Sequence, residues 1–444
     1  MAGHHDQIND SGTHRTPHTF LVAAGLLLAV TACKDGAQTA LETDFAGPPG
    51  TRGRPATMAI VPSSTGTNGC NGLDQSFLSC EEINLALPLV SLMNPQASTL
   101  KRITSTQSSS DLLYATVNLT TSSGTSIIEM DLSDPVSPPA LRHLLPEGAI
   151  DDLVSSLLGV AGSKANLAGL TVLDDDTVLV LELTSNTVLA VGRNAPGFLF
   201  HFAGRASATP EFIDGAARTA AGFAFDEESE LCATEDGLVF VTDTGNHALR
   251  VISAASVIDP AGIVLTVTGM GPSLPGFADG DLVTAMFDSP TGIATHCADR
   301  LIVTERGDNG AGHRLRSIQF DGFDLSLGIF TGTVLTEVGD GMPLTSAGLA
   351  PLAQTAAPNS PAVSASGEIY WIDSLTGVMR RESVMGVVDC PLAPSGDCSV
   401  PSMLCSVGSG ADFAPGNSFS SAISGDGDLY VLESDTVVLR RFGP

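Results

Sequence analysis

Short hydrophobic runs that each end in an acidic residue recur along the chain. They are rich in β-branched and aromatic residues and are bounded by Gly, Asp and Ser, a composition typical of strands between tight turns. The five runs are VLVLE (178–182), VFVTD (239–243), LIVTE (301–305), IYWID (369–373) and LYVLE (429–433). Each run predicts a strand that is followed by a hairpin.

The spacing of these runs indicates a repeated structural unit. The terminal acidic residues, Glu182, Asp243, Glu305, Asp373 and Glu433, are separated by 61, 62, 68 and 60 residues. An upstream unit, LLYATVNL (112–119) with TSIIEMDL (125–132), lies about one period earlier. Four short strands cannot bury both faces of their sheet alone, whereas a ring of such sheets can. We therefore expect an all-β fold, a six-bladed β-propeller with four-stranded antiparallel blades and negligible helix after about residue 98.

The last unit needs a strand from elsewhere in the chain. The sequence stops after VVLRRFG (437–443), which corresponds to the third strand of the sixth blade. An N-terminal strand that completes this blade would close the ring and remove the open edge. Two segments could serve, TMAIV (57–61) and INLALPLV (83–90), and we prefer the first.

Two of the units are nearly parallel in sequence and resemble a known repeat. One contains FIDG (212–215) and LVFVTDTGNHALRVI (238–252), and the next contains FADG (277–280), SPTGIA (289–294) and LIVTERGDNGAGHRLRSI (301–318). They resemble the NHL repeat, whose consensus combines a Gly-rich loop, a P-x-G-I-A strand and a VTDTGN-x-x-I/L-R hairpin. The resemblance is close in 203–320, extends over about 160–444 and implies a six-bladed NHL-like propeller.

Each acidic residue at a strand end is a candidate structural anchor. In four of the five units an arginine follows it by seven positions, or by eleven where the hairpin is longer: Arg250, Arg316, Arg380 and Arg440. The carboxylate can accept N–H bonds at the turn, and the arginine on the returning strand can pair with it. A catalytic group is needed once, whereas this pair recurs in successive blades. We therefore interpret the acidic residues and the arginines as hairpin locks.

The N-terminus carries the pattern of an exported protein. Residues 19–31 (TFLVAAGLLLAVT) form an uncharged apolar run that suits a signal peptide and is too short to span a bilayer. The following VTAC (30–33) resembles the lipobox of bacterial lipoproteins, which implies that Cys33 is acylated and becomes the first residue. An ordinary signal peptide with a chance cysteine is the alternative. We expect a signal peptide (1–32), a lipidated flexible tether (33–56), a closing strand with a disulfide-clipped segment (57–97) and the propeller (98–444), anchored by lipid in the bacterial cell envelope.

The net charge of the chain restricts the kinds of molecule that it can bind. The whole chain carries a net charge of −29. Removal of residues 1–32 takes away Arg15, Asp6 and Asp10, which leaves 19 − 47 = −28. Such a chain repels phosphate backbones, so we expect no nucleic-acid binding.

Seven cysteines follow Cys33 in a compartment that permits disulfides. Cys70 could pair with Cys80, two of Cys390, Cys398 and Cys405 could pair, and Cys232 could bridge to Cys297 in the next blade.

No motif in the sequence predicts catalysis or a cofactor. The mature chain has five histidines, of which His247 and His313 fall in hairpin turns and His201 in a lead-in strand; the other two are His143 and His296. They do not converge on a metal site, and Asp174–Asp176 and Asp426–Asp428 read as turns rather than calcium loops. We expect no cofactor and a non-catalytic, envelope-tethered binding or scaffold module for protein, peptide or glycan ligands. The alternative is a hydrolase or lyase with its site at the central channel.

Overall fold

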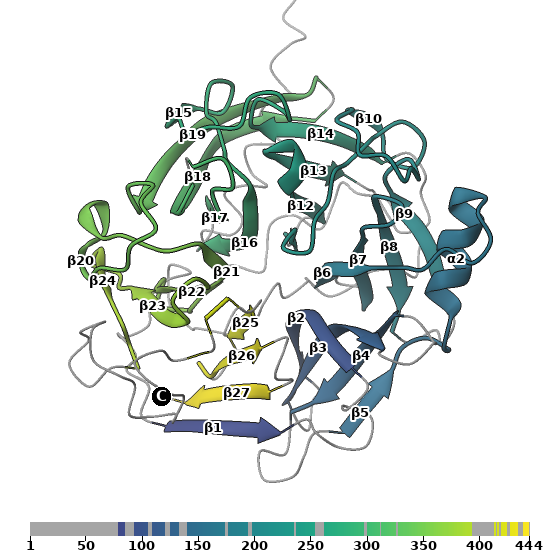
Figure 1. Cartoon of the computed structure of the whole chain (residues 1–444), viewed down its shortest axis with the longest axis horizontal. Helices are drawn as coiled ribbons and strands as arrows, with labels where there is room; N and C mark the ends of the chain where they lie inside the picture. The colour runs from purple at the N-terminus through teal and green to yellow at the C-terminus, as the bar shows by residue number, and fades with distance from the viewer. Residues whose placement is uncertain are drawn as a thin grey trace, which may run out of the picture.

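Six small antiparallel sheets surround one axis in the computed structural model of the chain (Figure 1). This confirms the predicted six-bladed β-propeller. The structure describes residues 79–84, 93–104, 109–119, 125–132, 140–173, 176–193, 198–234, 237–253, 262–296, 300–310, 312–325, 327–392, 413, 415–416, 419–423, 427–433 and 438–443. Cys33 and the segment 57–61 lie outside these residues.

The first two blades have four strands each. Blade 1 consists of β2 (Met93–Thr104), β3 (Ser109–Leu119), β4 (Thr125–Asp131) and β5 (Ala140–His143). Blade 2 consists of β6 (Leu167–Val172), β7 (Thr177–Glu182), β8 (Thr187–Gly192) and β9 (Leu199–Ala203). The unit predicted upstream of the five acidic runs is thus a blade, formed around β3 and β4.

Blades 3, 4 and 5 each carry a fifth, two-residue strand at the outer edge. Blade 3 holds β10 (Gly215–Ala216), β11 (Leu231–Ala233), β12 (Leu238–Asp243), β13 (Ala248–Ser253) and β14 (Ile263–Thr268). Blade 4 holds β15 (Gly280–Asp281), β16 (Pro290–His296), β17 (Arg300–Glu305), β18 (Arg314–Asp324) and β19 (Ile329–Val338). Blade 5 holds β20 (Gly348–Leu349), β21 (Pro358–Val363), β22 (Ile369–Asp373), β23 (Val378–Glu382) and β24 (Val387–Asp389). Two short 3-10 turns, η2 (Thr244–Asn246) and η3 (Ala350–Leu352), belong to blades 3 and 5.

The sixth blade is closed by an N-terminal strand, as expected. It consists of β25 (Phe419–Ile423), β26 (Leu429–Glu433), β27 (Val438–Gly443) and β1 (Ser79–Asn84). The preferred closing segment, 57–61, was the wrong choice: the strand that pairs with β27 overlaps the start of the second candidate. The antiparallel register sets Glu81 opposite Arg441 and Glu82 opposite Arg440. Opposite charges in register favour this pairing.

In the part of the chain that the structure describes, one α-helix departs from the expected all-β fold. α2 (Ala149–Leu158) lies in the connection between blades 1 and 2, on the outside of the ring (Figure 1). Its buried face includes Ile150 and Val154, and left-handed glycines, Gly148 and Gly159, bound it at both ends. Among the described residues no helix is long and apolar enough to cross a membrane.

Burial between neighbouring blades forms the core. One apolar cluster runs through blades 2, 3 and 4, and smaller clusters join blades 1 and 2, 4 and 5, and 5 and 6. The innermost strands β2, β6, β11, β16, β21 and β25 contact their neighbours around the whole ring. The backbones of neighbouring inner strands therefore approach one another at every junction of the ring.

The cysteines correct one expectation. Cys232 is a free, buried thiol on β11, so the bridge to Cys297 suggested by the sequence is not formed. Its side chain lies in the apolar cluster between the blades instead. Cys390 is disulfide-bonded. Pairing within its trio and between Cys70 and Cys80 stays a prediction.

Candidate functional site

The predicted anchors form buried ion pairs inside their own blades. Asp243 and Arg250 are both fully buried, and Arg250 Nη1 donates to Asp243 Oδ2 at 2.7 Å. The other side of the guanidinium donates to the carbonyl of Ile213 at 2.8 Å and to Asp214 Oδ1 at 2.8 Å. The arginine therefore ties the hairpin to the loop that leads into the blade.

The same arrangement recurs in the later blades. Arg316 pairs with Glu305 at 2.9 Å, Arg380 with Asp373 at 2.8 Å and Arg440 with Glu433 at 3.2 Å. Glu182, which has no arginine, accepts the turn N–H groups of Thr184 at 2.9 Å and Ser185 at 2.8 Å. Asp243 differs from the expected turn lock, because the backbone N–H it accepts comes from Ala224, outside its own hairpin, at 2.7 Å.

The histidines make contacts within the scaffold. His247 Nδ1 accepts the N–H of Ser289 at 3.0 Å, and His313 Nδ1 accepts the N–H of Ala357 at 3.0 Å, each in the following blade. Asn186 occupies the equivalent hairpin position in blade 2 and accepts the N–H of Phe225 at 3.2 Å. All three have positive φ, near +50° to +60°. Among the described residues no group of three His, Cys, Asp or Glu side chains could hold a metal ion.

Residues that break the repeat gather at one junction. Thirteen residues before the acidic anchor, four blades carry Gly169, Gly292, Ser360 and Ser420, whereas blade 3 carries Glu230 (243 − 230 = 13). Fifteen residues before it, the others carry Leu167, Pro290, Pro358 and Ser418, whereas blade 3 carries Glu228. Directly after it, the others carry Leu183, Thr244, Ser374 and Ser434, whereas blade 4 carries Arg306.

Matching hydrogen bonds show that this alignment holds in space. The N–H of Glu230 donates to Thr242 Oγ1 at 2.8 Å, and the N–H of Gly292 donates to Thr304 Oγ1 at 2.8 Å. A Cβ atom on Gly292 would lie 2.3 Å from Pro361, and one on Gly169 would lie 2.6 Å from the Cα of Glu230. These junctions leave no room for a side chain, whereas the junction of blades 3 and 4 holds a glutamate.

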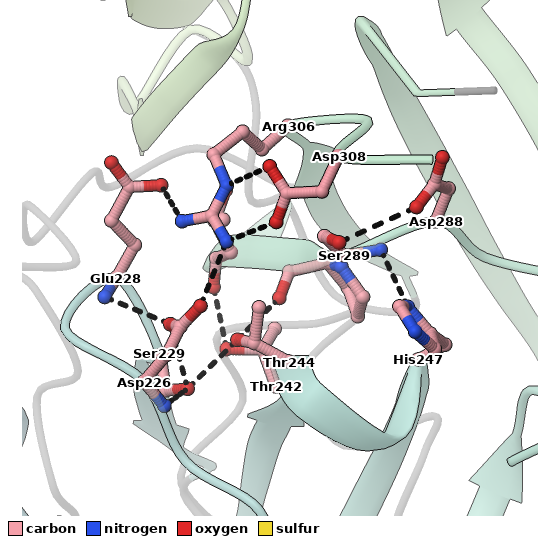
Figure 2. A network of polar contacts seen from close by, with 12 residues as sticks. Asp226, Glu228, Ser229, Thr242, Thr244, His247, Asp288, Ser289, Arg306 and Asp308 are labelled. Carbon is pink, nitrogen blue, oxygen red and sulfur yellow. Dashed lines mark hydrogen bonds and ion pairs between the residues drawn. The ribbon is translucent and has the colours of Figure 1, made fainter. Parts of the chain in front are cut away.

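Arg306 is the centre of the resulting network, which we call the Arg306 cluster (Figure 2). From the β17–β18 loop it reaches back to the lead-in of blade 3, where it donates to Glu228 at 2.7 Å and to Asp226 at 2.9 Å. It also binds both carboxylate oxygens of Asp308, with Nε at 2.7 Å from Oδ1. Three carboxylates thus surround one guanidinium, all of them partly exposed. The cluster has an excess of negative charge.

A chain of hydroxyl groups holds this cluster between the two blades. The hydroxyl oxygens of Ser229 and Thr244 lie within hydrogen-bond distance, at 2.7 Å, and Thr244 Oγ1 donates to the carbonyl of Pro290 at 2.7 Å. Ser229 Oγ also accepts the N–H of Asp226 at 2.9 Å. Figure 2 shows Ser229 and Thr244 with His247 and Ser289, which join the same two blades. The carboxylates are therefore held on a hydrogen-bonded frame.

Glu230 adjoins the cluster on the innermost edge of blade 3. Its Oε2 accepts the N–H of Ile293, on the inner strand of blade 4, at 3.1 Å. Burial raises the pKa of Glu230 to about 7, and the nearby Glu228 adds to the rise. Burial also raises the pKa of Glu228, although Arg306 opposes it. A carboxyl that titrates near neutral pH can act as an acid or a base, or can bind a cationic group.

Sequence reasoning missed Glu228, Glu230 and Arg306. It followed the positions that recur, and these three are departures from the repeat. The signal was available, because DEESE (226–230) aligns with DSPTG (288–292) once the acidic anchors are superposed. Their meeting could not be read from the sequence, since it depends on how blade 4 lies against blade 3.

Comparison with known proteins finds only distant similarity to solved structures. No family model matches the chain, and no curated protein matches it. Among solved structures, a catalytically inactive virginiamycin B lyase from Staphylococcus aureus is 10% identical, with a TM-score of 0.43, over 82% of this chain and 99% of that one. An auxiliary nutrient binding protein from Bacteroides thetaiotaomicron is 10% identical, with a TM-score of 0.42, over 74% and 66%. YCF48 from Cyanidioschyzon merolae is 10% identical, with a TM-score of 0.40, over 82% and 99%. Similarity this distant carries no argument about activity.

Proposed function

We propose that the protein is a non-catalytic binding module of the bacterial cell envelope, an NHL-like propeller tethered through acylated Cys33, that takes its ligand at the Arg306 cluster. The observation that carries this proposal is the gathering of repeat-breaking polar residues at one junction. Residues that recur, such as Asp243 and Arg250, have partners within the scaffold. Glu228, Glu230 and Arg306 occur once, at adjacent places, and are not needed by the other blades.

The charge of the cluster favours a ligand with a basic group. Asp226, Glu228 and Asp308 share one guanidinium, so two carboxylates lack a matching cation within the cluster. The net charge of −29 for the whole chain steers cations toward the surface and repels anions. Among protein, peptide and glycan ligands, a peptide or protein segment with lysine or arginine therefore fits best.

This function is tested with a panel of basic, neutral and acidic peptides and neutral glycans. The mature chain should bind basic peptides, and binding should weaken as salt rises. The double variant Glu228→Gln, Glu230→Gln should weaken it by roughly tenfold, about 1.4 kcal/mol. The double variant Asp321→Asn, Glu147→Gln, which removes two exposed acidic residues outside the cluster, is the matched control. Equal losses of peptide affinity in both variants would mean that binding depends on net charge alone. The proposal that the Arg306 cluster binds the ligand would then be wrong.

A second candidate is a hydrolase or lyase that uses Glu230 as its acid or base. It is favoured by the pKa of Glu230, raised to about 7 by burial on the innermost edge of blade 3. A panel of esters, lactones and glycosides would reveal such an activity. Its rate should change with an inflection near pH 7 that Glu230→Gln abolishes. No turnover of any panel member, together with binding of basic peptides, would leave the binding function alone.

A further inference from the structure

The outer corner of blade 5 exposes aliphatic side chains on two adjacent turns. They are Leu349 and Leu352, around η3, and Val384, Met385 and Val387, in the β23–β24 turn. Met385 is 81% exposed and Leu352 is 78% exposed. Leu349 pairs with Val387 in register, so the two turns form one surface, which we call the blade 5 corner.

This corner is a departure from the repeat. The residue after the outer glycine is Ala216 in blade 3 and Asp281 in blade 4, but Leu349 in blade 5. Three positions further, Thr219 and Thr284 become Leu352. No charged residue occurs between Asp340 and Glu368, nor within 383–388, in a chain with 49 acidic residues. An uncharged aliphatic surface on so acidic a protein calls for an apolar partner.

The backbone of the corner already has internal hydrogen bonds. Ser383 and Val387 are joined by an N–H to carbonyl bond of 2.9 Å, and the N–H of Gly386 donates to Ser383 at 2.8 Å. The N–H of Ala350 donates to Gly386 at 2.8 Å, which ties the two turns together. Hydrocarbon accepts only backbone groups that are satisfied internally. The corner also lacks the Trp, Tyr and Arg side chains that dominate protein interfaces.

The position of the N-terminal strand brings a membrane within reach. β1 begins at Ser79, on the side of blade 6 that faces blade 5 (Figure 1). The 46 residues from Cys33 to Leu78 can span at most about 160 Å. An acyl chain on Cys33 would therefore hold the propeller near a bilayer, and docking of a weak apolar surface would become an intramolecular step.

We propose that the blade 5 corner docks on the bilayer surface, with its aliphatic side chains among the lipid headgroups and upper acyl chains. This rests on the acylation of Cys33 in the proposed function. Docking would hold the ring in one orientation on the membrane. The chemistry selects neutral, zwitterionic lipid, because the strongly acidic protein is repelled by an anionic surface.

The test uses the full chain, purified from bacterial membranes and placed in phosphatidylcholine vesicles. Mass spectrometry first reports whether Cys33 carries acyl chains. A fluorescent probe at Met385→Cys should then be quenched by lipids spin-labelled near the headgroup. A probe at Val283→Cys, 76% exposed on blade 4, is the matched control and should stay unquenched. In the Leu349→Ser, Leu352→Ser background the docked-to-undocked ratio should fall roughly tenfold or more.

Each outcome separates docking from anchoring. An acylated chain whose Met385→Cys probe is no more quenched than the Val283→Cys probe would overturn docking and leave the anchor intact. An unmodified Cys33 with no vesicle association would overturn both. If the Met385→Cys probe is not quenched and this cysteine instead cross-links chains in a concentration-dependent way, the corner forms contacts between copies of this chain, and docking on the bilayer is overturned.

Discussion

At the scale of single residues, each position of a repeat protein can be compared with the equivalent positions in its other repeats. Asp243 and Arg250 have counterparts in the later blades that make the same contact, so their geometry belongs to the fold. In the four other units with an acidic anchor, glycine or serine stands in place of Glu230 in each, and no charged residue stands at the position of Arg306. The departure from the repeat is therefore a more informative mark of function here than the chemical type of a residue.

Replacing Asp243 by alanine should test the scaffold role of the anchors. Arg250 would stay buried with only the half-exposed Asp214 as an ionic partner, and Ala224 and Asn246 would lose an acceptor. Breaking a buried pair from one side costs about 3 kcal/mol, so the melting temperature should fall clearly. Asp214→Ala removes the half-exposed partner of the same arginine and should cost under about 1 kcal/mol. Normal stability with lost peptide binding would instead place Asp243 in the functional site.

Glu382 should make the stability of the protein depend on pH. It is 7% exposed, and its Oε2 has no hydrogen-bond partner among the described residues. Burial raises the pKa of Glu382 from 4.5 to about 7, and the nearby Glu337 adds to the rise. The neutral form is favoured in the folded state, so its stabilising effect is complete below pH 4.5 and is lost as pH rises to 7.

Denaturation curves of Glu382→Gln between pH 4 and 8 measure this effect. The variant should match the parent near pH 4 and be more stable above pH 7, by up to roughly 3 kcal/mol. Glu147→Gln, at an exposed glutamate, serves as the control. A parent protein whose stability rises steadily from pH 4.5 to 7 relative to Glu382→Gln would contradict the assignment.

At the scale of elements, local sequence predicted the hairpins well and the junctions poorly. The five acidic runs are β7, β12, β17, β22 and β26, because alternating β-branched residues decide strand formation locally. β1 could not be chosen over 57–61 from composition, since SCEEIN has the weaker strand propensity and pairs through its register with β27. α2 and the two-residue strands lie in connections that the repeat does not constrain. The Arg306 cluster was missed for the same reason, because it joins two elements far apart in sequence.

The left-handed residue at the hairpin tip should be replaceable only by one that keeps both its conformation and its acceptor. His247 has φ +52° and accepts the N–H of Ser289, as Asn186 does for Phe225. The free energy of unfolding of His247→Asn should stay within about 1 kcal/mol of that of the parent. His247→Val combines a β-branched residue at positive φ with a lost acceptor and should cost about 2–4 kcal/mol. Chemical denaturation of the two variants measures this difference. Equal losses of stability would mean that the hydrogen bond from the hairpin tip does not help to join the blades.

At the scale of the whole molecule, closure of the ring depends on the pairing of β1 with β27. These strands come from opposite ends of the described chain, and six register pairs join them, from Ser79 with Gly443 to Asn84 with Val438. No other described strand covers the outer edge of β27. Without β1 that edge would present unpaired N–H and C=O groups, which is a template for association with other chains.

A chain that starts after residue 84 should therefore fold less stably and self-associate. Blade 6 would keep β25, β26 and β27 but lose its fourth strand, and the outer edge of β27 would be exposed. We expect a lower melting temperature and a sedimentation profile that shifts to larger species as concentration rises. A synthetic peptide of residues 75–88 should reverse both changes, whereas one with Glu81→Lys and Glu82→Lys should reverse them less, because like charges would then face Arg441 and Arg440 in the register. A truncated chain that stays monomeric and melts like the parent would show that blades 1 to 5 hold the ring without this closure.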